Sequence, residues 1–154
     1  MKKLIVVTML VALVAMSGVA MAATATGSLN VTAAVTPSCR VTGTTAINFG
    51  SYDPTDTSPK DAAGDFTFRC TKGTAYNLYI TGTRQMTDGT NNLGFEIYSD
   101  ATRTTAYPSA LAGAISGTSA NNAANTQNLY GRISAEQDVP AGAYSKSLTV
   151  TVEY

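Results

Sequence analysis

Apolar and polar residues alternate with a period of two along several short stretches of this chain. The clearest stretch is the last one, where polar residues separate four apolar positions: Leu148, Val150, Val152 and Tyr154. A second stretch lies near the N-terminus and has the apolar positions Leu29, Val31, Ala33 and Val35. Because successive side chains of a β-strand point to opposite faces, each stretch predicts a strand with one apolar face.

Shorter runs with the same alternation lie between these two. They pass through Cys39 and Val41, Ile47 and Phe49, Phe66 and Phe68, Tyr76 to Ile80, Phe95 and Ile97, and Leu129 to Ile133. Residues typical of turns separate the runs, at Lys72 to Thr74, Asp88 to Asn92 and Pro140 to Gly142. About seven short strands with turns between them predict an all-β sandwich.

Two longer segments are predicted to be loops. The segment from Asp53 to Asp65 contains two prolines, a glycine and four aspartates, which favour turns at a surface. Residues 108–128 are small, mostly polar and uncharged, and they show no sustained period. There we expect a long loop with one short strand or one turn of helix.

The first 22 residues have the pattern of an export signal. Lys2 and Lys3 precede an apolar run from Leu4 to Ala15, and Ala20-Met21-Ala22 is a small-x-small cleavage pattern. The run is shorter than the roughly 20 residues that span a bilayer, which argues against a retained anchor. We expect cleavage before Ala23, export to an oxidising compartment, and a mature chain of 154 − 22 = 132 residues, enough for one domain.

The chain has two cysteines, Cys39 and Cys70. In an exported protein such a pair most simply forms one disulfide. Two sulfurs without a histidine make a poor zinc site, which needs four ligands, and a redox-active pair usually has the Cys-x-x-Cys spacing. A structural disulfide is therefore favoured over a metal site or a reactive thiol.

Composition and charge argue against most catalytic and nucleic-acid functions. The chain has no histidine and no tryptophan, and without Lys2 and Lys3 it carries eight basic against ten acidic residues. This balance does not attract nucleic acid. The acids between Asp53 and Asp65 lack the spacing of an EF-hand and lie in a hydrophilic stretch. We predict a protein that is not an enzyme, with no catalytic residue, no metal site and no cofactor.

The two amphipathic end strands need partners, because an uncovered strand edge with an apolar face is a liability. The N-terminal run from Leu29 to Val35 could close the sandwich of its own chain. Alternatively, it could add to the sheet edge of a second copy, with backbone hydrogen bonds for affinity and alternate side chains for register. The alternation itself fits both arrangements.

Several segments together resemble the spore coat protein U domain family, which includes subunits of Csu-type pili assembled by archaic chaperone-usher systems. The segments are Ile47 to Tyr52 after Cys39, Phe66 to Tyr76 around Cys70, Arg84 with Met86, Leu93 to Asp100, Tyr130 to Ile133, Pro140 to Tyr144, and Leu148 to Tyr154. They span essentially the whole mature chain. Two positions depart from the family pattern: Tyr107 stands where a tryptophan is often found, and Ser145-Lys146 replace the usual acidic residue.

The resemblance implies an immunoglobulin-like β-sandwich that is incomplete, with six strands plus an N-terminal donor strand and one disulfide. Residues 1–22 would be the signal peptide, 23–36 the donor-strand extension and 37–154 the domain. An apolar acceptor groove between the first and last strands would be lined on one side by Leu148, Val150, Val152 and Tyr154. It would receive the donor residues of the next subunit, Leu29, Val31, Ala33 and Val35.

The function implied by the resemblance is that of a structural subunit of a pilus fibre at the cell surface, which supports surface attachment and biofilm formation. Its partners would be copies of itself, a periplasmic chaperone, an outer-membrane usher and other pilus subunits. The alternative from the residues alone is a secreted, self-closed binding module or a coat protein. In such a module, the segments 53–65 and 108–128 would contact a surface or a carbohydrate.

Overall fold

The computed structural model describes residues 22–154, so the predicted signal lies almost entirely outside the described residues. The chain divides into two units, with the boundary between Ala34 and Val35. Residues 22–34 of the first unit belong to no strand and are all exposed. The period-two pattern predicts a strand there, but a strand exists only when a partner shares its backbone hydrogen bonds, and this segment has none.

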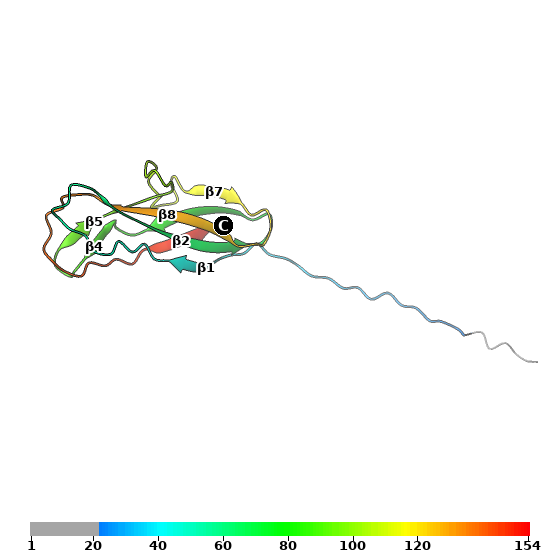
Figure 1. Ribbon diagram of the computed structural model, residues 1–154. Helices are drawn as coiled ribbons and strands as arrows, with labels where there is room; N and C mark the ends of the chain where they lie inside the picture. Colours follow the sequence, from blue (N-terminus) through cyan, green and yellow to red (C-terminus); the bar gives the residue numbers. More distant parts are fainter. Residues whose placement is uncertain (1–21) are drawn as a thin grey trace, which may run out of the picture. The chain divides into compact units, whose positions relative to one another are not determined.

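The second unit contains all nine strands found in the described residues (Figure 1). They are β1 (Cys39–Thr45), β2 (Lys60–Cys70), β3 (Ala75–Thr81), β4 (Gln85–Thr87), β5 (Asn92–Gly94), β6 (Glu96–Tyr98), β7 (Ile115–Thr118), β8 (Asn125–Ile133) and β9 (Thr149–Glu153). The all-β prediction is confirmed. Among residues 22–154 there is no helix of the length and apolarity needed to cross a membrane.

The strands form a sandwich of two main antiparallel sheets. One sheet has the order β1-β2-β8-β6 and the other the order β7-β3-β9, while β4 and β5 form a separate hairpin. The core lies between the two main sheets and consists of side chains that alternate along the strands, such as Phe66 and Phe68 on β2 and Leu78 and Ile80 on β3. Each of these four side chains is buried.

The inner face of the sheet that contains β1 carries two glycines, and the segment that follows β1 packs against them. A Cβ at Gly64 would lie 3.0 Å from Ile47, and one at Gly131 would lie 2.7 Å from both Ile47 and Phe49. The segment after β1 thus packs the side chains of Ile47 and Phe49 against glycine positions, which have no side chain. The sequence run through Ile47 and Phe49 is therefore a core-filling segment and not the strand that its alternation predicts.

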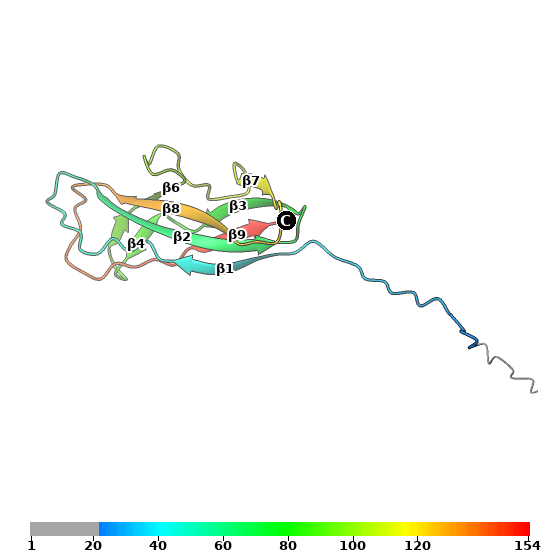
Figure 2. The ribbon, with the colours of Figure 1, turned by 45° about the vertical axis from the view of Figure 1, so that its right-hand side comes forward.

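The two ends of the domain are formed by different loops, and they are called the disulfide end and the hairpin end. At the disulfide end, residues 38–40, 69–74 and 119–122 gather, because Thr71 N donates to Ser38 O and Gly73 N donates to Ser119 O. At the hairpin end lie residues 46–59, 82–95 and 134–147, which the antiparallel bridge between Thr87 and Ser145 helps to join. Figure 2 shows these ends on opposite sides of the domain, with β2 and β8 running between them.

Two predicted boundaries are wrong. The segment from Asp53 to Asp65 is a loop only up to residue 59, and from Lys60 on it pairs with β8. Its inward positions hold Ala62 and Gly64, which are too small to produce an amphipathic signal. Likewise, β8 begins at Asn125, four residues before the predicted start, because its polar side chains there face outward or lie near the end of the sheet.

The segments predicted around residues 108–128 and 93–97 are resolved in finer detail. Residues 108–128 contain the one short strand expected, β7, before β8 begins. The strand predicted through Phe95 and Ile97 begins only after Phe95, as β6, while the residues just before Phe95 form β5. Phe95 N donates to Arg84 O, so the chain changes from the hairpin to the main sheet at this residue.

Candidate functional site: an open edge between β1 and β9

One side of the sandwich is bordered by two strands that each have a single neighbour. β1 pairs with β2 alone and β9 pairs with β3 alone, so each strand ends its sheet. The figures show β1 and β9 on the same side of the domain (Figure 2). Among the described residues no further strand is hydrogen-bonded to the outer side of β1 or β9, although the two strands approach each other closely. An edge strand without a second partner can accept an additional strand.

Side chains that face inward on these two strands remain partly exposed to solvent. Val41 lies opposite Phe68, which is buried in the core, yet Val41 itself is 39% exposed. Val150 and Val152 lie opposite the buried Ile80 and Leu78, yet both are only partly buried. An inward position that solvent still reaches indicates that the sandwich lacks cover along this side.

The predicted acceptor residues occupy this open edge. Val150 and Val152 belong to β9, and Leu148, directly before it, packs on the core. Leu148 also approaches Gly82 so closely that a Cβ there would lie 2.7 Å from its Cδ2, and Gly82 has a φ of +120°. Tyr154 follows β9 and is 60% exposed. The structure thus places the four residues in a row along the open side.

The opposite side of the sandwich is closed by the chain itself. Tyr98 at the end of β6 bridges to Ala106, Tyr107 N donates to Ile97 O, and Ile80 N donates to Pro108 O. The segment therefore passes from one sheet to the other. Tyr107 is 2% exposed and its ring meets that of Phe66 edge-on. From the sequence, Tyr107 was predicted only to occupy a position where a tryptophan is often found. Its place in the core at this side of the sandwich was not predicted.

The open edge continues into a cavity of about 650 Å³ at the hairpin end. Its walls are the chain just after β1, residues 46–54, and the chain just before β9, residues 139–146. Apolar side chains dominate its lining, and they include Ile47, Phe49, Met86, Leu93, Ile133 and Val139. The uncovered region is thus longer than β1 and β9 themselves.

The predicted donor residues form an apolar stripe on the first unit and at its boundary. Leu29 is 87% exposed, Val31 is 85% exposed and Val35 is 82% exposed. Ala33, on the same alternation, is also exposed. A stripe of this kind in water is unfavourable, because each buried aliphatic side chain of this size would gain about 1.5–3 kcal/mol.

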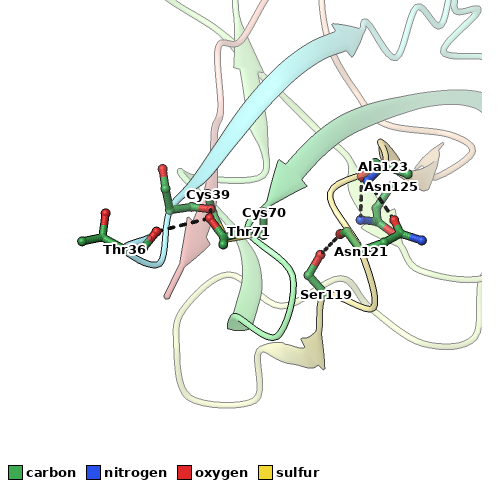
Figure 3. The surroundings of a disulfide bond; sticks show 9 residues. Thr36, Cys39, Cys70, Thr71, Ser119, Asn121, Ala123 and Asn125 are labelled. Carbon is green, nitrogen blue, oxygen red and sulfur yellow. Dashed lines mark hydrogen bonds between the residues drawn. A yellow bond between two sulfur atoms is a disulfide. The ribbon is translucent and has the colours of Figure 1, made fainter. Parts of the chain in front are cut away.

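The disulfide between Cys39 and Cys70 is confirmed. Figure 3 shows it where the chain enters the domain, next to Thr36 and Thr71. The Thr71 hydroxyl donates to Thr36 O at 3.4 Å, and Thr71 N donates to Ser38 O at 2.8 Å. The residues that precede β1 are thereby tied to the turn between β2 and β3.

Ionic groups in the domain hold strands β2 and β8 and the loop after β6 in place. Arg132 donates two hydrogen bonds to Asp61, at 2.7 and 2.8 Å, and Arg103 lies 3.3 Å from the same carboxylate. Hydrogen bonding from Arg132 lowers the pKa of Asp61. Asp100 accepts from the Thr102 hydroxyl and from the backbone of Thr104, which moves its pKa far below the usual range.

Arg40, Arg69 and Lys72 are a feature that sequence reasoning did not single out. They line a shallow pocket at the disulfide end, together with Ser38, Thr71, Asn121 and Asn122. Arg40 and Arg69 are direct cross-strand partners, a relation that no sequence pattern reveals until the register of β1 on β2 is known. Among the described residues, no cluster of three or more metal-binding side chains is present.

Residues 25–151 match the protein family described as Spore Coat Protein U domain. Among solved structures, the chain is similar to the crystal structure of the CsuC–CsuE chaperone–tip adhesion subunit pre-assembly complex from archaic chaperone-usher Csu pili of Acinetobacter baumannii. The identity is 21% and the TM-score 0.51, and the match covers 78% of this chain and 40% of that one. None of the curated proteins matches.

Proposed function

Because the chain belongs to the Spore Coat Protein U domain family, we propose that it is a structural subunit of an extracellular pilus fibre built by the chaperone-usher pathway. The proposal is carried by the presence in one chain of two complementary features. These are an open sandwich edge at β1 and β9 and an exposed apolar stripe at Leu29 to Val35. The apolar stripe of one subunit would cover the open edge of another. The role requires no catalytic group.

In the proposed assembly, residues 23–36 of one subunit add a strand between β1 and β9 of the next. The donor side chains are Leu29, Val31, Ala33 and Val35, and the acceptor wall includes Leu148, Val150, Val152 and Tyr154. Burial of the three larger donor side chains contributes on the order of 5–9 kcal/mol before ordering costs. Each added backbone hydrogen bond contributes about 0.5–1.5 kcal/mol.

The open edge also explains why a subunit would need help before assembly. An uncovered edge with an apolar face aggregates with other edges, so a periplasmic chaperone would cover it until an outer-membrane usher brings the next subunit. The similar solved structure contains a chaperone with a pilus subunit, which supports this order of events. The subunit would reach the cell surface through the periplasm, where the fibre would support attachment and biofilm formation.

The test compares two substitutions on adjacent residues of the extension. Val31→Asp places a charge on the apolar stripe, whereas Asn30→Asp places the same charge on the opposite face, since neighbours in a strand point apart. We expect Val31→Asp to abolish fibres and Asn30→Asp to leave them intact, as seen by electron microscopy and by multimer ladders on gels of unheated samples. Equal assembly of both variants would contradict the proposed register.

A deletion separates the fibre from a self-closed binding module. Removal of residues 23–36 should leave a domain that folds and binds chaperone but does not polymerise. If the extension instead closes its own sandwich, the deletion should destabilise the monomer, and the full-length protein should run as a single monomer band under mild conditions.

A further inference from the structure

The disulfide end carries positive charge that the domain itself does not neutralise. Arg40 and Arg69 are directly opposed on β1 and β2, and Lys72 lies in the turn that follows. All three side chains are exposed. Like charges directly opposite each other on a sheet are unfavourable. Among the described residues, none of the three lies within 4.0 Å of a carboxylate, since the ion pairs involve Arg84, Arg103 and Arg132.

The hairpin end carries mainly negative charge. Its acids are Asp53, Asp56, Asp88, Glu136 and Asp138, against the cations Lys60, Arg84 and Lys146, and Arg84 is paired with Glu96. The backbone N–H of Thr55 donates to Asp53 and lowers the pKa of that carboxyl. Hydrogen bonds from Asn91 lower the pKa of Asp88 to about 2. Both groups therefore stay ionised in mildly acidic as well as neutral solution.

The short tether before β1 limits how far apart two linked subunits can lie. If Val35 is the last donor residue in a neighbour's groove, Cys39 follows four residues later, which a chain spans in at most about 14 Å. Pro37 restricts the tether further, and Thr36 O accepts from Thr71 at the disulfide end. The disulfide end of each donor subunit must then lie against the acceptor where the donor strand leaves the groove.

Strand direction decides which end of the acceptor that is. β9 runs from Thr149, paired with Thr81, to Glu153, paired with Asn77 near the start of β3, so it runs toward the disulfide end. A strand added antiparallel to β9 leaves the groove at the hairpin end. The opposite direction would crowd two junctions at one end, because each subunit's own tether also begins at its disulfide end.

We propose that the cationic pocket of Arg40, Arg69 and Lys72 docks on the acidic loop 53–59 of the preceding copy of this chain, as a second contact beside the donor strand. The inference rests on the proposed function. Loop 53–59 is the last part of the connection from β1 to β2, so it and the pocket lie at opposite ends of the same sheet. Asp53 and Asp56 supply the complementary carboxylates.

The test is zero-length carbodiimide crosslinking of assembled wild-type fibres, followed by peptide mass spectrometry. The reagent joins an amine to a carboxylate in direct contact, so we expect a Lys72–Asp56 or Lys72–Asp53 linkage. This linkage reports on two subunits, because the eleven residues of β2 separate the sites within one domain by about 36 Å. The yield should fall severalfold from 0.1 to 1 M salt, as the Debye length shrinks from about 10 to about 3 Å.

Two variants serve as matched controls. Lys72→Arg keeps the charge but removes the amine, so the linkage should disappear while the fibres persist. Asp56→Lys should slow polymerisation, and Arg40→Glu in the same chain should restore the rate, whereas Asn128→Glu in the middle of β8 should have no effect.

The outcomes separate this inference from the proposed function. Fibres without a linkage from Lys72 to loop 53–59 would overturn the docking contact alone, as would a linkage to Glu136, Asp138 or Glu153 in its place. Absence of fibres from the wild-type protein with its chaperone and usher would overturn the proposed function itself. Failure of Arg40→Glu to rescue Asp56→Lys would likewise refute the charge pairing.

Discussion

The two lateral sides of the sandwich are built from similar strands but finished differently. On the β6 side, the chain from Ser99 to Thr118 bridges both sheets and places Tyr107 in the core. On the β1 side, the inward-facing Val41 is still 39% exposed. The contrast shows that an open edge is a local property, because the segment after β6 bridges the two sheets on the other side of the same domain.

On the closed side, the loop after β6 is held in place by hydrogen bonds of its own side chains. Asp100 accepts hydrogen bonds from the backbone of Thr104 and Thr105, and Arg103 donates to Gly131 O while its guanidinium lies 5.9 Å from the centre of the Tyr130 ring. Arg103 adopts a φ of +57° within this loop. Among residues 22–154 no such segment covers the open side, and in the proposed assembly the cover comes from another chain.

The largest effect is expected from the disulfide, which secures the open-side strand β1 to β2. Replacement of Cys39 and Cys70 together by alanine frees a loop of 31 residues and should lower the free energy of unfolding by about 3–4 kcal/mol. Urea unfolding of the purified subunit, bound to chaperone and then released, measures it. A loss below about 1 kcal/mol would show that β1 is held chiefly by its backbone ladder.

A matched pair of truncations compares the two edge strands of the β1 sheet directly. Ile97→Ala on β6 removes a side chain that is 2% exposed and should cost about 2–5 kcal/mol. Val41→Ala on β1 should cost less than about 1 kcal/mol in the free subunit, because solvent already reaches that side chain. In assembled fibres the cost at Val41 should rise. Equal costs in the free subunit would mean that the open edge is covered there.

Tyr107→Phe is expected to stabilise the closed side. The Tyr107 hydroxyl is buried and has no hydrogen-bond partner within the described part of the chain, and burial raises its pKa so that it remains protonated. Removing it should increase the free energy of unfolding by about 1 kcal/mol, since an unsatisfied buried polar group is lost. Thermal unfolding of both proteins measures the change. A lower melting temperature for the variant would indicate that a water molecule bonds the hydroxyl.

The smallest effect concerns pH and the loop of the closed side. The pKa of Asp100 is lowered on folding, chiefly by the Thr102 hydroxyl, so its contribution is present above the unfolded pKa of about 3.9 and is lost as the pH falls below that value. Asp100→Asn should be slightly less stable than the wild type at pH 7. The difference should shrink progressively as the pH falls from about 4 to about 2, because protonation of the unfolded state begins there while the folded state keeps Asp100 ionised. A constant difference across this range would show that the charge of Asp100 has no role.

The sequence predicted the parts of the fold that large apolar side chains mark. The alternation at Phe66, Phe68, Leu78 and Ile80 identified β2 and β3, because each inward position holds a bulky residue. The first half of β2 escaped notice, since its inward positions are Ala62 and Gly64, and the space above them is filled by Ile47 from a distant segment. Such compensation between segments leaves no local signal.

The candidate site was predictable in its residues but not in its geometry. The apolar positions from Leu148 to Tyr154 and from Leu29 to Val35 follow from alternation. One side of the sandwich is closed because the chain crosses from one sheet to the other near Pro108, whose carbonyl accepts from Ile80 N. No local sequence pattern predicts this crossing. The opposition of Arg40 to Arg69 also depends on register.

In the proposed fibre, the position of the disulfide has a mechanical consequence under tension. Force that enters a subunit through its extension reaches the domain at Ser38 and meets Cys39 at once. The covalent bond transfers the load to Cys70, at the end of the longest strand, which is paired on both sides by β1 and β8. The hydrogen bonds between β1 and β2 are thus not broken one at a time. The force instead acts along β2 and is shared by its hydrogen bonds to both neighbouring strands.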